Sequence, residues 1–138
     1  AIDTELLEMV FLGTPHIAGY STDGKANGTS MAVMELSRFF NLPLTGWYPA
    51  DILPPPVPVI RLNSDEDMET ILGKSVNHTY NITEDDIKLR FRPADFEIIR
   101  GEYPVRREFH AYTVKLEGKK KDEAGNLLRK IGFKLSEM

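Results

Sequence analysis

The chain has no cysteine among its 138 residues. It can therefore form neither disulfides nor thiolate-bound metal sites, and this composition is typical of the reducing cytoplasm, where we expect the protein to act. No apolar run approaches the ~20 residues that a membrane-spanning helix needs, so we expect no membrane partner. The net charge is −4, which argues against a nucleic-acid partner.

Two further features are missing from the beginning of the chain. No G-x-G-x-x-G turn occurs, and no earlier strand could pair in parallel with the apolar residues 9–12. The first residue is Ala1 rather than a methionine. Together these features predict a fragment that begins shortly before the last strand of an α/β domain.

Hydrophobic periodicity and proline content predict an α+β fold in three parts. Residues 1–45 are predicted to be the remnant of a Rossmann-type α/β domain, residues 46–56 a proline-rich linker, and residues 57–138 a small α+β domain. The first part should contain a helix at 4–8, a strand at 9–12 and a long helix over 21–41, capped by Ser21, Thr22 or Asp23. In the small domain we expect strands at 57–62, 109–116 and 133–136, helices at 65–76, 93–102 and 122–131, and an acidic, turn-rich segment between the first two helices.

The three short strands of residues 57–138 are expected to form a mainly antiparallel sheet with open edges. Open edges are a hazard unless something covers them, and about 80 residues is small for a self-sufficient core. We therefore predict a homodimer that forms through residues 57–138.

The loop after residues 9–12 is the strongest candidate for a functional site. His16 follows a short apolar run, Pro15 restrains Thr14 to an extended conformation, and Gly19 permits a close backbone approach by a ligand. This pattern favours a proton-handling imidazole at His16, although an isolated histidine is more often structural.

The same loop satisfies a phosphate-loop pattern, since residues 19–25 read G-x-x-x-x-G-K. The next residue is Ala26 instead of Ser or Thr, so the magnesium-binding hydroxyl is missing. A phosphate loop of the nucleotide-binding kind is therefore not expected.

A cluster of arginines at residues 100–107 offers a second candidate site. Arg106 and Arg107 suit bidentate capture of phosphate or carboxylate, and the alternative is salt bridging within the domain to Glu102, Glu108 or Asp95. His78 and His110 have no partners at metal-ligand spacing, and we expect no metal site.

Two blocks of residues carry a family resemblance. The first is His-Ile-Ala-Gly-Tyr at 16–20 with Gly24-Lys25-Ala26 and Gly28-Thr29, and the second is residues 96–100 with Tyr103, Arg106-Arg107-Glu108, Leu127-Leu128 and Ile131-Gly132-Phe133. On these residues the chain resembles the C-terminal part of the 4-phosphoerythronate dehydrogenase family, within the D-2-hydroxyacid dehydrogenase superfamily.

The resemblance implies oxidation of 4-phospho-D-erythronate at its 2-hydroxyl, giving 2-oxo-3-hydroxy-4-phosphobutanoate in pyridoxal 5′-phosphate biosynthesis. It also implies that NAD accepts the hydride, His16 accepts the proton, Gly19 lies against NAD and Tyr20 reaches the substrate. Arg106 or Arg107 is expected to bind the substrate phosphate.

The glutamate and arginine that complete the family's active site lie upstream of this chain by the same resemblance, and Glu5 and Glu8 do not stand in for them. We therefore expect the chain alone to be inactive and to serve as the dimerisation module of its parent enzyme. The alternative is a stand-alone dimerising or regulatory α+β module with a vestigial His16.

Overall fold

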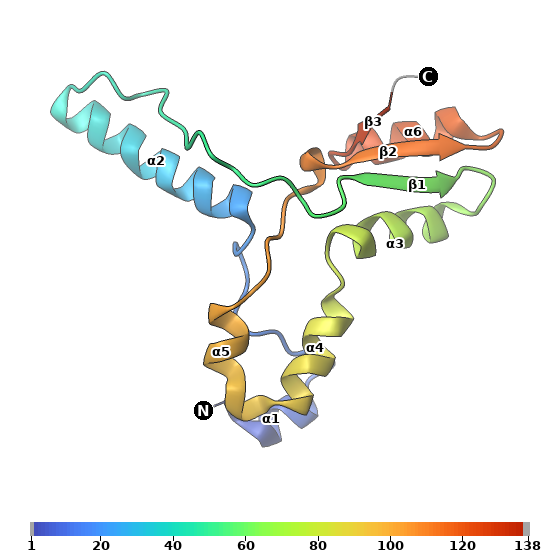
Figure 1. The fold of residues 1–138 in the computed structure, drawn as a ribbon, viewed down its shortest axis with the longest axis horizontal. Coiled ribbons are helices and arrows are strands. Elements are labelled where there is room, and N and C mark those ends of the chain that lie inside the picture. The colour runs from blue at the N-terminus through green and yellow to red at the C-terminus, as the bar shows by residue number, and fades with distance from the viewer. Residues whose placement is uncertain (1, 137–138) are drawn as a thin grey trace.

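The computed structural model describes residues 2–136, which form an extended molecule with three parts (Figure 1). A sheet with α3 and α6 lies at one end, α2 projects from the other, and α1, α4 and α5 form a group below them. The helices are α1 (Thr4–Met9), α2 (Thr22–Phe40), α3 (Met68–Thr79), α4 (Ile82–Phe91), α5 (Phe96–Gly101) and α6 (Lys121–Lys130), with 3-10 turns η1 (Pro93–Asp95) and η2 (Phe109–Ala111). The strands are β1 (Val59–Asn63), β2 (Thr113–Glu117) and β3 (Lys134–Leu135).

The sheet is parallel, in the order β1-β2-β3. Val59 pairs with Thr113, and the β1–β2 register continues to Asn63 with Glu117, while β2 pairs with β3 in the same direction. The α+β class is confirmed, but the expectation of an antiparallel sheet is wrong. Each connection between consecutive strands contains a helix, which carries the chain back to the end of the sheet where the previous strand began. Connections of this kind join parallel strands.

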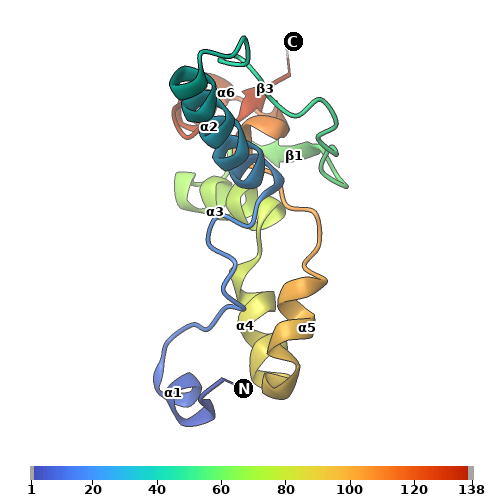
Figure 2. The ribbon, with the colours of Figure 1, turned by 90° about the vertical axis from the view of Figure 1, so that its left-hand side faces the viewer.

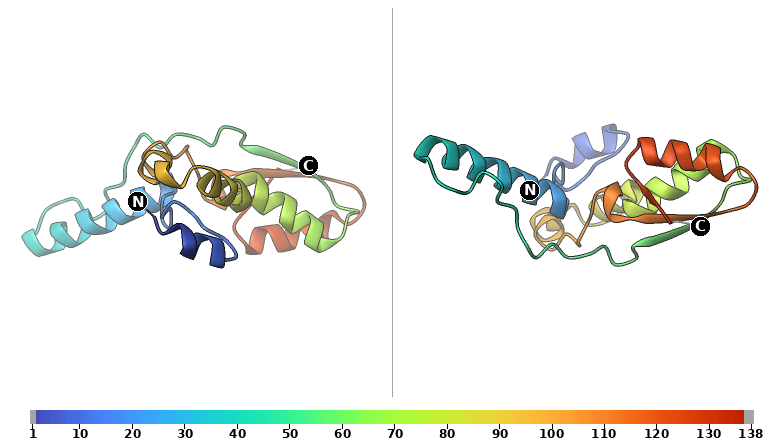
Figure 3. Two further views of the ribbon diagram at one scale, coloured as in Figure 1. Left: turned by 90° about the horizontal axis from the view of Figure 1, so that it is seen from below. Right: turned by 90° about the horizontal axis from the view of Figure 1, so that it is seen from above.

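Both crossover helices cover the same face of the sheet, as the end views show (Figure 3). Ile60, Leu62 and Val114 from the strands pack in one cluster with Ile71 of α3 and Leu128 of α6. Residues that alternate with these along β1 are exposed, so the other face of this strand is open. The single buried face explains why buried and exposed residues alternate along β1.

A second, smaller cluster joins α1, α4 and α5, away from the sheet (Figure 2). Leu7, Leu89 and Ile99 form its centre. Arg90 of α4 strengthens it, because its guanidinium donates to the carbonyl oxygens of Leu7 at 2.5 Å and Val10 at 2.9 Å. The acidic segment predicted to be turn-rich is therefore largely helical, as α4.

Residues 9–12 do not form the predicted strand. Met9 is the last residue of α1, and Phe11 is 93% exposed. A short apolar run is typical of a buried strand, but here Met9 is also 83% exposed, and no strand among the described residues pairs with this segment. The prediction that a Rossmann-type strand precedes the histidine loop is therefore wrong for this structure.

The long helix α2 agrees with its predicted extent and begins with a capped turn. The Ser21 hydroxyl accepts a hydrogen bond from the Gly24 amide at 2.9 Å, and Asn41 ends the helix in a left-handed conformation. The proline-rich segment then runs back along the helix (Figure 1), where Ser30 donates to the Trp47 carbonyl at 2.7 Å and Tyr48 donates to Asn27 at 2.9 Å. Among the described helices, none combines the length and apolar character needed to cross a membrane.

Gly118, in the turn after β2, is the backbone position least tolerant of a side chain in the sheet unit. Its φ is +113°, and an added Cβ would lie 2.6 Å from the Ser64 hydroxyl oxygen. Gly118→Ala should therefore lower the free energy of unfolding by about 1–3 kcal/mol in urea titrations. Gly73→Ala is the matched control: Gly73 lies inside α3 with open space around it, so alanine should stabilise the chain by about 0.5–1 kcal/mol. Equal effects of both substitutions would contradict this account.

Candidate active site around His16

The loop from Gly13 to Ser21 is held at both ends by hydrogen bonds to distant parts of the chain. The Gly13 amide donates to the Asp86 carboxylate of α4 at 2.7 Å. After the loop, the Thr22 amide donates to the Arg106 carbonyl at 2.8 Å. These contacts fix the loop between the α4 group and the segment that leads into the sheet.

Within this loop His16 is presented outward. Pro15 and Ile17, its two neighbours, are buried, whereas His16 is exposed. The amide of His16 donates to the Thr14 carbonyl at 2.8 Å, and its φ is +57°, a left-handed conformation that few residues other than glycine adopt. Such strain is often found at functional sites, where the surrounding structure fixes a side chain in one direction.

Gly19 and Gly24 allow the loop to close onto the start of α2. Gly19 has a φ of +68°, and an added Cβ there would meet open space, so its backbone is accessible to a ligand. Gly24 is different, because an added Cβ would lie 2.8 Å from the Gly19 carbonyl oxygen. The close approach of these two residues sets the turn between His16 and the helix.

Tyr20 lies in a cluster of cations and phenols. The Lys25 ammonium is 3.7 Å from its ring centroid, the Arg100 guanidinium carbon is 5.8 Å from it, and the Tyr103 ring meets it edge-on at 6.0 Å. Burial and then the neighbouring Asp85 carboxylate raise the pKa of Tyr103, so this phenol stays protonated at neutral pH and donates to Asp85 at 2.6 Å.

The two arginines predicted to bind phosphate have different environments. Arg107 donates from Nε and Nη2 to the Asp23 carboxylate at 2.8 and 3.0 Å, and from Nη1 to the Leu53 carbonyl at 2.6 Å. Arg106 instead stacks over the Tyr80 ring, with its guanidinium carbon 4.6 Å from the centroid. The guanidinium of Arg107 is thus already engaged by the protein, and that of Arg106 faces an aromatic ring.

Asp23 is the residue of this region that the sequence did not single out beyond a helix cap. It is 2% exposed and also accepts from the Glu108 amide at 2.8 Å. Burial opposes its ionisation, but the hydrogen bonds from Arg107 and Glu108 outweigh burial and hold the pKa of Asp23 below its usual range. From its position near the start of a predicted helix, Asp23 was a candidate for the helix cap only. Nothing in the sequence indicated that it would pair with Arg107.

His110 also contacts Asp23, a partner that the sequence analysis did not predict. Its Nε2 lies 3.1 Å from Asp23 Oδ1. Arg107 does not form an ion pair with Glu102 or Glu108, the nearby partners predicted for the arginine cluster. The acidic partner comes from a helix 84 residues away in sequence.

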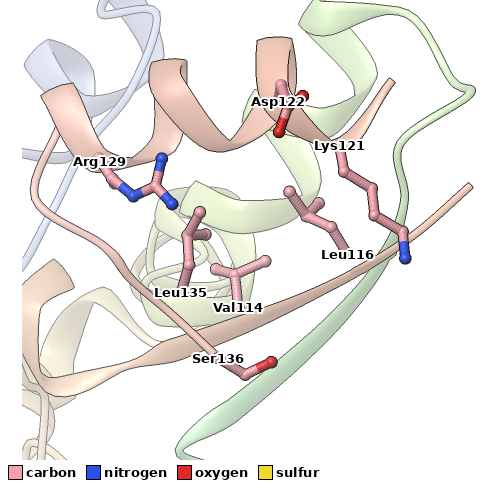
Figure 4. A pocket seen from close by; sticks show the side chains of 7 residues that line it. All are labelled: Val114, Leu116, Lys121, Asp122, Arg129, Leu135 and Ser136. Atoms are coloured by element: carbon pink, nitrogen blue, oxygen red, sulfur yellow. The ribbon is translucent and has the colours of Figure 1, made fainter. Parts of the chain in front are cut away.

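A cavity of about 150 Å³ lies apart from these residues, between α6 and the strands β2 and β3 (Figure 4). Val114, Leu116 and Leu135 form its apolar floor, and Lys121 and Arg129 extend from α6 at its rim. It includes none of the predicted site residues, so the structure does not connect it to His16.

Comparison with known proteins first identifies the domain family to which the chain belongs. A family model described as "Domain of unknown function (DUF3410)" matches residues 52–132, which include the whole β1-to-α6 unit. The chain belongs to this family.

The particular relatives carry a more informative name, because curated proteins named erythronate-4-phosphate dehydrogenase match the chain. One from Bacteroides thetaiotaomicron is 47% identical over 113 residues, covering 82% of this chain and 30% of the relative. Another, from Hahella chejuensis, is 33% identical and covers 99% of this chain and 38% of the relative. The relative from Marinobacter nauticus is 34% identical, with 97% of this chain and 37% of the relative covered. The resemblance inferred from the two sequence blocks is confirmed, and the chain spans about a third of the length of these relatives.

Proposed function

We propose that this chain is part of an oxidoreductase that oxidises 4-phospho-D-erythronate at its 2-hydroxyl to 2-oxo-3-hydroxy-4-phosphobutanoate. The observation that carries the proposal is the outward presentation of His16 in a strained loop, within a chain whose relatives are named erythronate-4-phosphate dehydrogenase. The strain indicates a functional constraint, and the relatives' name indicates which reaction it serves.

In this reaction His16 acts as the general base. Its imidazole takes the proton of the substrate's 2-hydroxyl while the hydrogen on the same carbon leaves as hydride, so that the C–O bond becomes a carbonyl. A bound nicotinamide cofactor supplies the hydride acceptor. The open space at Gly19 fits a cofactor that lies against the backbone there, and we propose that Tyr20 contacts the substrate.

The chain alone is proposed to be inactive, because the residues that the structure describes include no cofactor fold, and by the resemblance the arginine that binds the substrate carboxylate lies outside this chain. We expect no NADH formation when the 138-residue chain is mixed with NAD and 4-phosphoerythronate. Turnover by the chain alone would overturn the claim that the site needs residues beyond this chain.

A chimera tests the function itself. Our design replaces the matching segment of the Bacteroides thetaiotaomicron relative with this chain and follows NADH formation with 4-phosphoerythronate. Phosphate-dependent oxidation is expected, with unphosphorylated erythronate as the control substrate. A folded chimera that binds NAD but does not oxidise 4-phosphoerythronate would contradict the proposal and favour the module with a vestigial histidine.

Homodimerisation through residues 57–138 forms the second half of the proposal. Phe91 and Ile87 of α4 are 84% and 60% exposed, and Ile98 of α5 is 51% exposed. Large apolar side chains exposed together are typical of surfaces that another protein covers. Light scattering tests this part, and a monomer mass for the chimera at high concentration would count against it.

A further inference from the structure

We propose that Lys25 and Arg100, gathered at the ring of Tyr20, form a seat for a phosphate dianion, which in the proposed reaction is the 4-phosphate of the substrate. The identity of the molecule that carries the phosphate depends on the proposed function. The capacity to bind a phosphate group does not depend on it, because it follows from this chain's own side chains.

The seat is built from two elements far apart in sequence. Tyr20 and Lys25 come from the start of α2, with the ammonium 3.7 Å from the ring centroid, whereas Arg100 comes from the last turn of α5, with its guanidinium carbon 5.8 Å from the same centroid. Both cations therefore lie within reach of one aromatic ring, which helps to hold them in place. A dianion that reaches both of them would form charge-assisted hydrogen bonds and offset the repulsion between their like charges.

Neither Lys25 nor Arg100 is held by a close carboxylate, in contrast to Arg90 and Arg107. Arg90 pairs with Asp86 at 2.9 Å and Arg107 with Asp23 at 2.8 Å. By contrast, among the described residues no carboxylate lies within ion-pair distance of Lys25.

Arg100 is weakly paired and incompletely hydrogen-bonded. Its ion-pair contact is Glu97 at 3.8 Å, and the Glu97 side chain is 80% exposed, so water screens this pair. The Nε of Arg100 is buried with no hydrogen-bond acceptor among the described residues. A buried donor without an acceptor is destabilising, and an anionic ligand drawing the guanidinium toward it would relieve this.

The surroundings of the seat keep its charge positive. Asp85 is the neighbouring carboxylate, and it accepts a hydrogen bond from the Tyr103 hydroxyl at 2.6 Å. Arg106, whose guanidinium lies over the Tyr80 ring, adds a third cation near Tyr103, which gives this corner of the molecule a positive excess in a chain of net charge −4. A local positive cluster can attract a small anion even in a protein whose net charge is negative.

The seat also shares a loop with the proposed base. Tyr20 is four residues beyond His16, and hydrogen bonds anchor this loop at both ends. The substrate carries its phosphate two carbons from the carbon that reacts. Capture of the phosphate would therefore orient the 2-hydroxyl toward His16 through binding energy from a part of the molecule that does not react.

The test uses the 138-residue chain and inorganic phosphate, at constant ionic strength because salt screens exposed charges. Titration followed by 1H–15N NMR should shift the amide signals of Tyr20 and Lys25 and the side-chain Nε–H signal of Arg100, which Arg100→Met would identify. Lys25→Met and Arg100→Met should each weaken phosphate binding at least about tenfold, the loss expected for one charge-assisted hydrogen bond. Arg61→Met removes one charge from the exposed face of β1 and should leave binding unchanged within about twofold.

A charge-conserving variant distinguishes a loss of phosphate binding from a loss of folding. Lys25→Arg keeps the cation over the ring and should retain most of the affinity, with an unchanged circular dichroism melt.

Equal weakening by Arg61→Met, or shifts spread over all basic residues, would overturn the seat as a specific site. If phosphate binding holds while the chimera fails to oxidise 4-phosphoerythronate, the seat stands and the proposed reaction is wrong. If the chimera is active and Lys25→Met does not raise KM for 4-phosphoerythronate, the seat is not the substrate's phosphate site.

Discussion

Asp23→Asn should destabilise the chain by about 3–5 kcal/mol, the largest loss that we expect from one substitution. The carboxylate is buried and takes two hydrogen bonds from Arg107 and one from the Glu108 amide. An amide places a donor against the guanidinium and leaves Arg107, whose side chain is 12% exposed, without its counter-charge. Because this pair joins the start of α2 to the segment before η2, its loss should also release the His16 loop.

Glu35→Gln provides the matched control, since it makes the same chemical change on the same helix. Glu35 pairs with Arg38 at 2.7 Å, but both side chains are at least 60% exposed. Exposed pairs contribute about 0–1 kcal/mol, so urea unfolding should separate the two variants clearly. Similar losses for the two substitutions would show that the buried pair contributes no more than a surface pair.

The Asp23 pair should also give stability a defined dependence on pH. Its pKa in the folded chain lies below the usual value of 3.8, so the unfolded chain binds the proton more readily. The stabilisation is therefore complete above that usual value and is lost as the pH falls through the lower pKa of the folded state. The difference between the chain and Asp23→Asn should shrink below about pH 4, measured by thermal melts across the acid range.

Periodicity predicted most of the helices and strands of the chain but not their arrangement. The order of β1, α3, β2, α6 and β3 and the extent of α2 follow from apolar spacing and capping residues. The parallel direction of the strands was available in the same pattern, since strands that alternate with helices favour crossovers. The weakly amphipathic α4 was missed because charged residues dominate it, although Glu84 and Asp85 at its start and Arg90 at its end match the helix dipole.

For the candidate site as well, neighbouring residues in the sequence predicted some features, and tertiary packing determined the others. The exposure of His16 could be predicted from its neighbours, because Pro15 and Gly19 flank it in a turn-forming segment. The pairing of Asp23 with Arg107 depends on the packing of α2 against a segment 84 residues away, and short-range spacing contains no information about it. Arg107 was predicted from its residue type to bind a ligand, with a salt bridge within the domain as the alternative, and in the structure it pairs with Asp23.

His16→Asn should lower kcat of the chimera by about 10²–10⁴-fold, because general-base catalysis contributes a factor of this size. Asparagine is the appropriate replacement since His16 has a φ of +57°, a conformation that asparagine tolerates better than alanine or glutamine. The substitution therefore removes the imidazole and keeps the loop. Binding of NAD, followed by fluorescence titration, and the melting temperature should remain unchanged.

His78→Asn is the control for the loss of a histidine elsewhere, because His78 lies on α3 and contacts the Val57 carbonyl at 2.9 Å. It should leave kcat within about twofold, since general-base catalysis requires the base to reach the reacting hydroxyl. A His16→Gly variant distinguishes chemistry from structure, because glycine accepts the positive φ and leaves room for added imidazole to restore part of the rate. If His16→Asn keeps kcat within a few-fold, or if imidazole restores nothing to an otherwise folded His16→Gly chimera, the strained loop serves structure and the proton acceptor must be sought elsewhere.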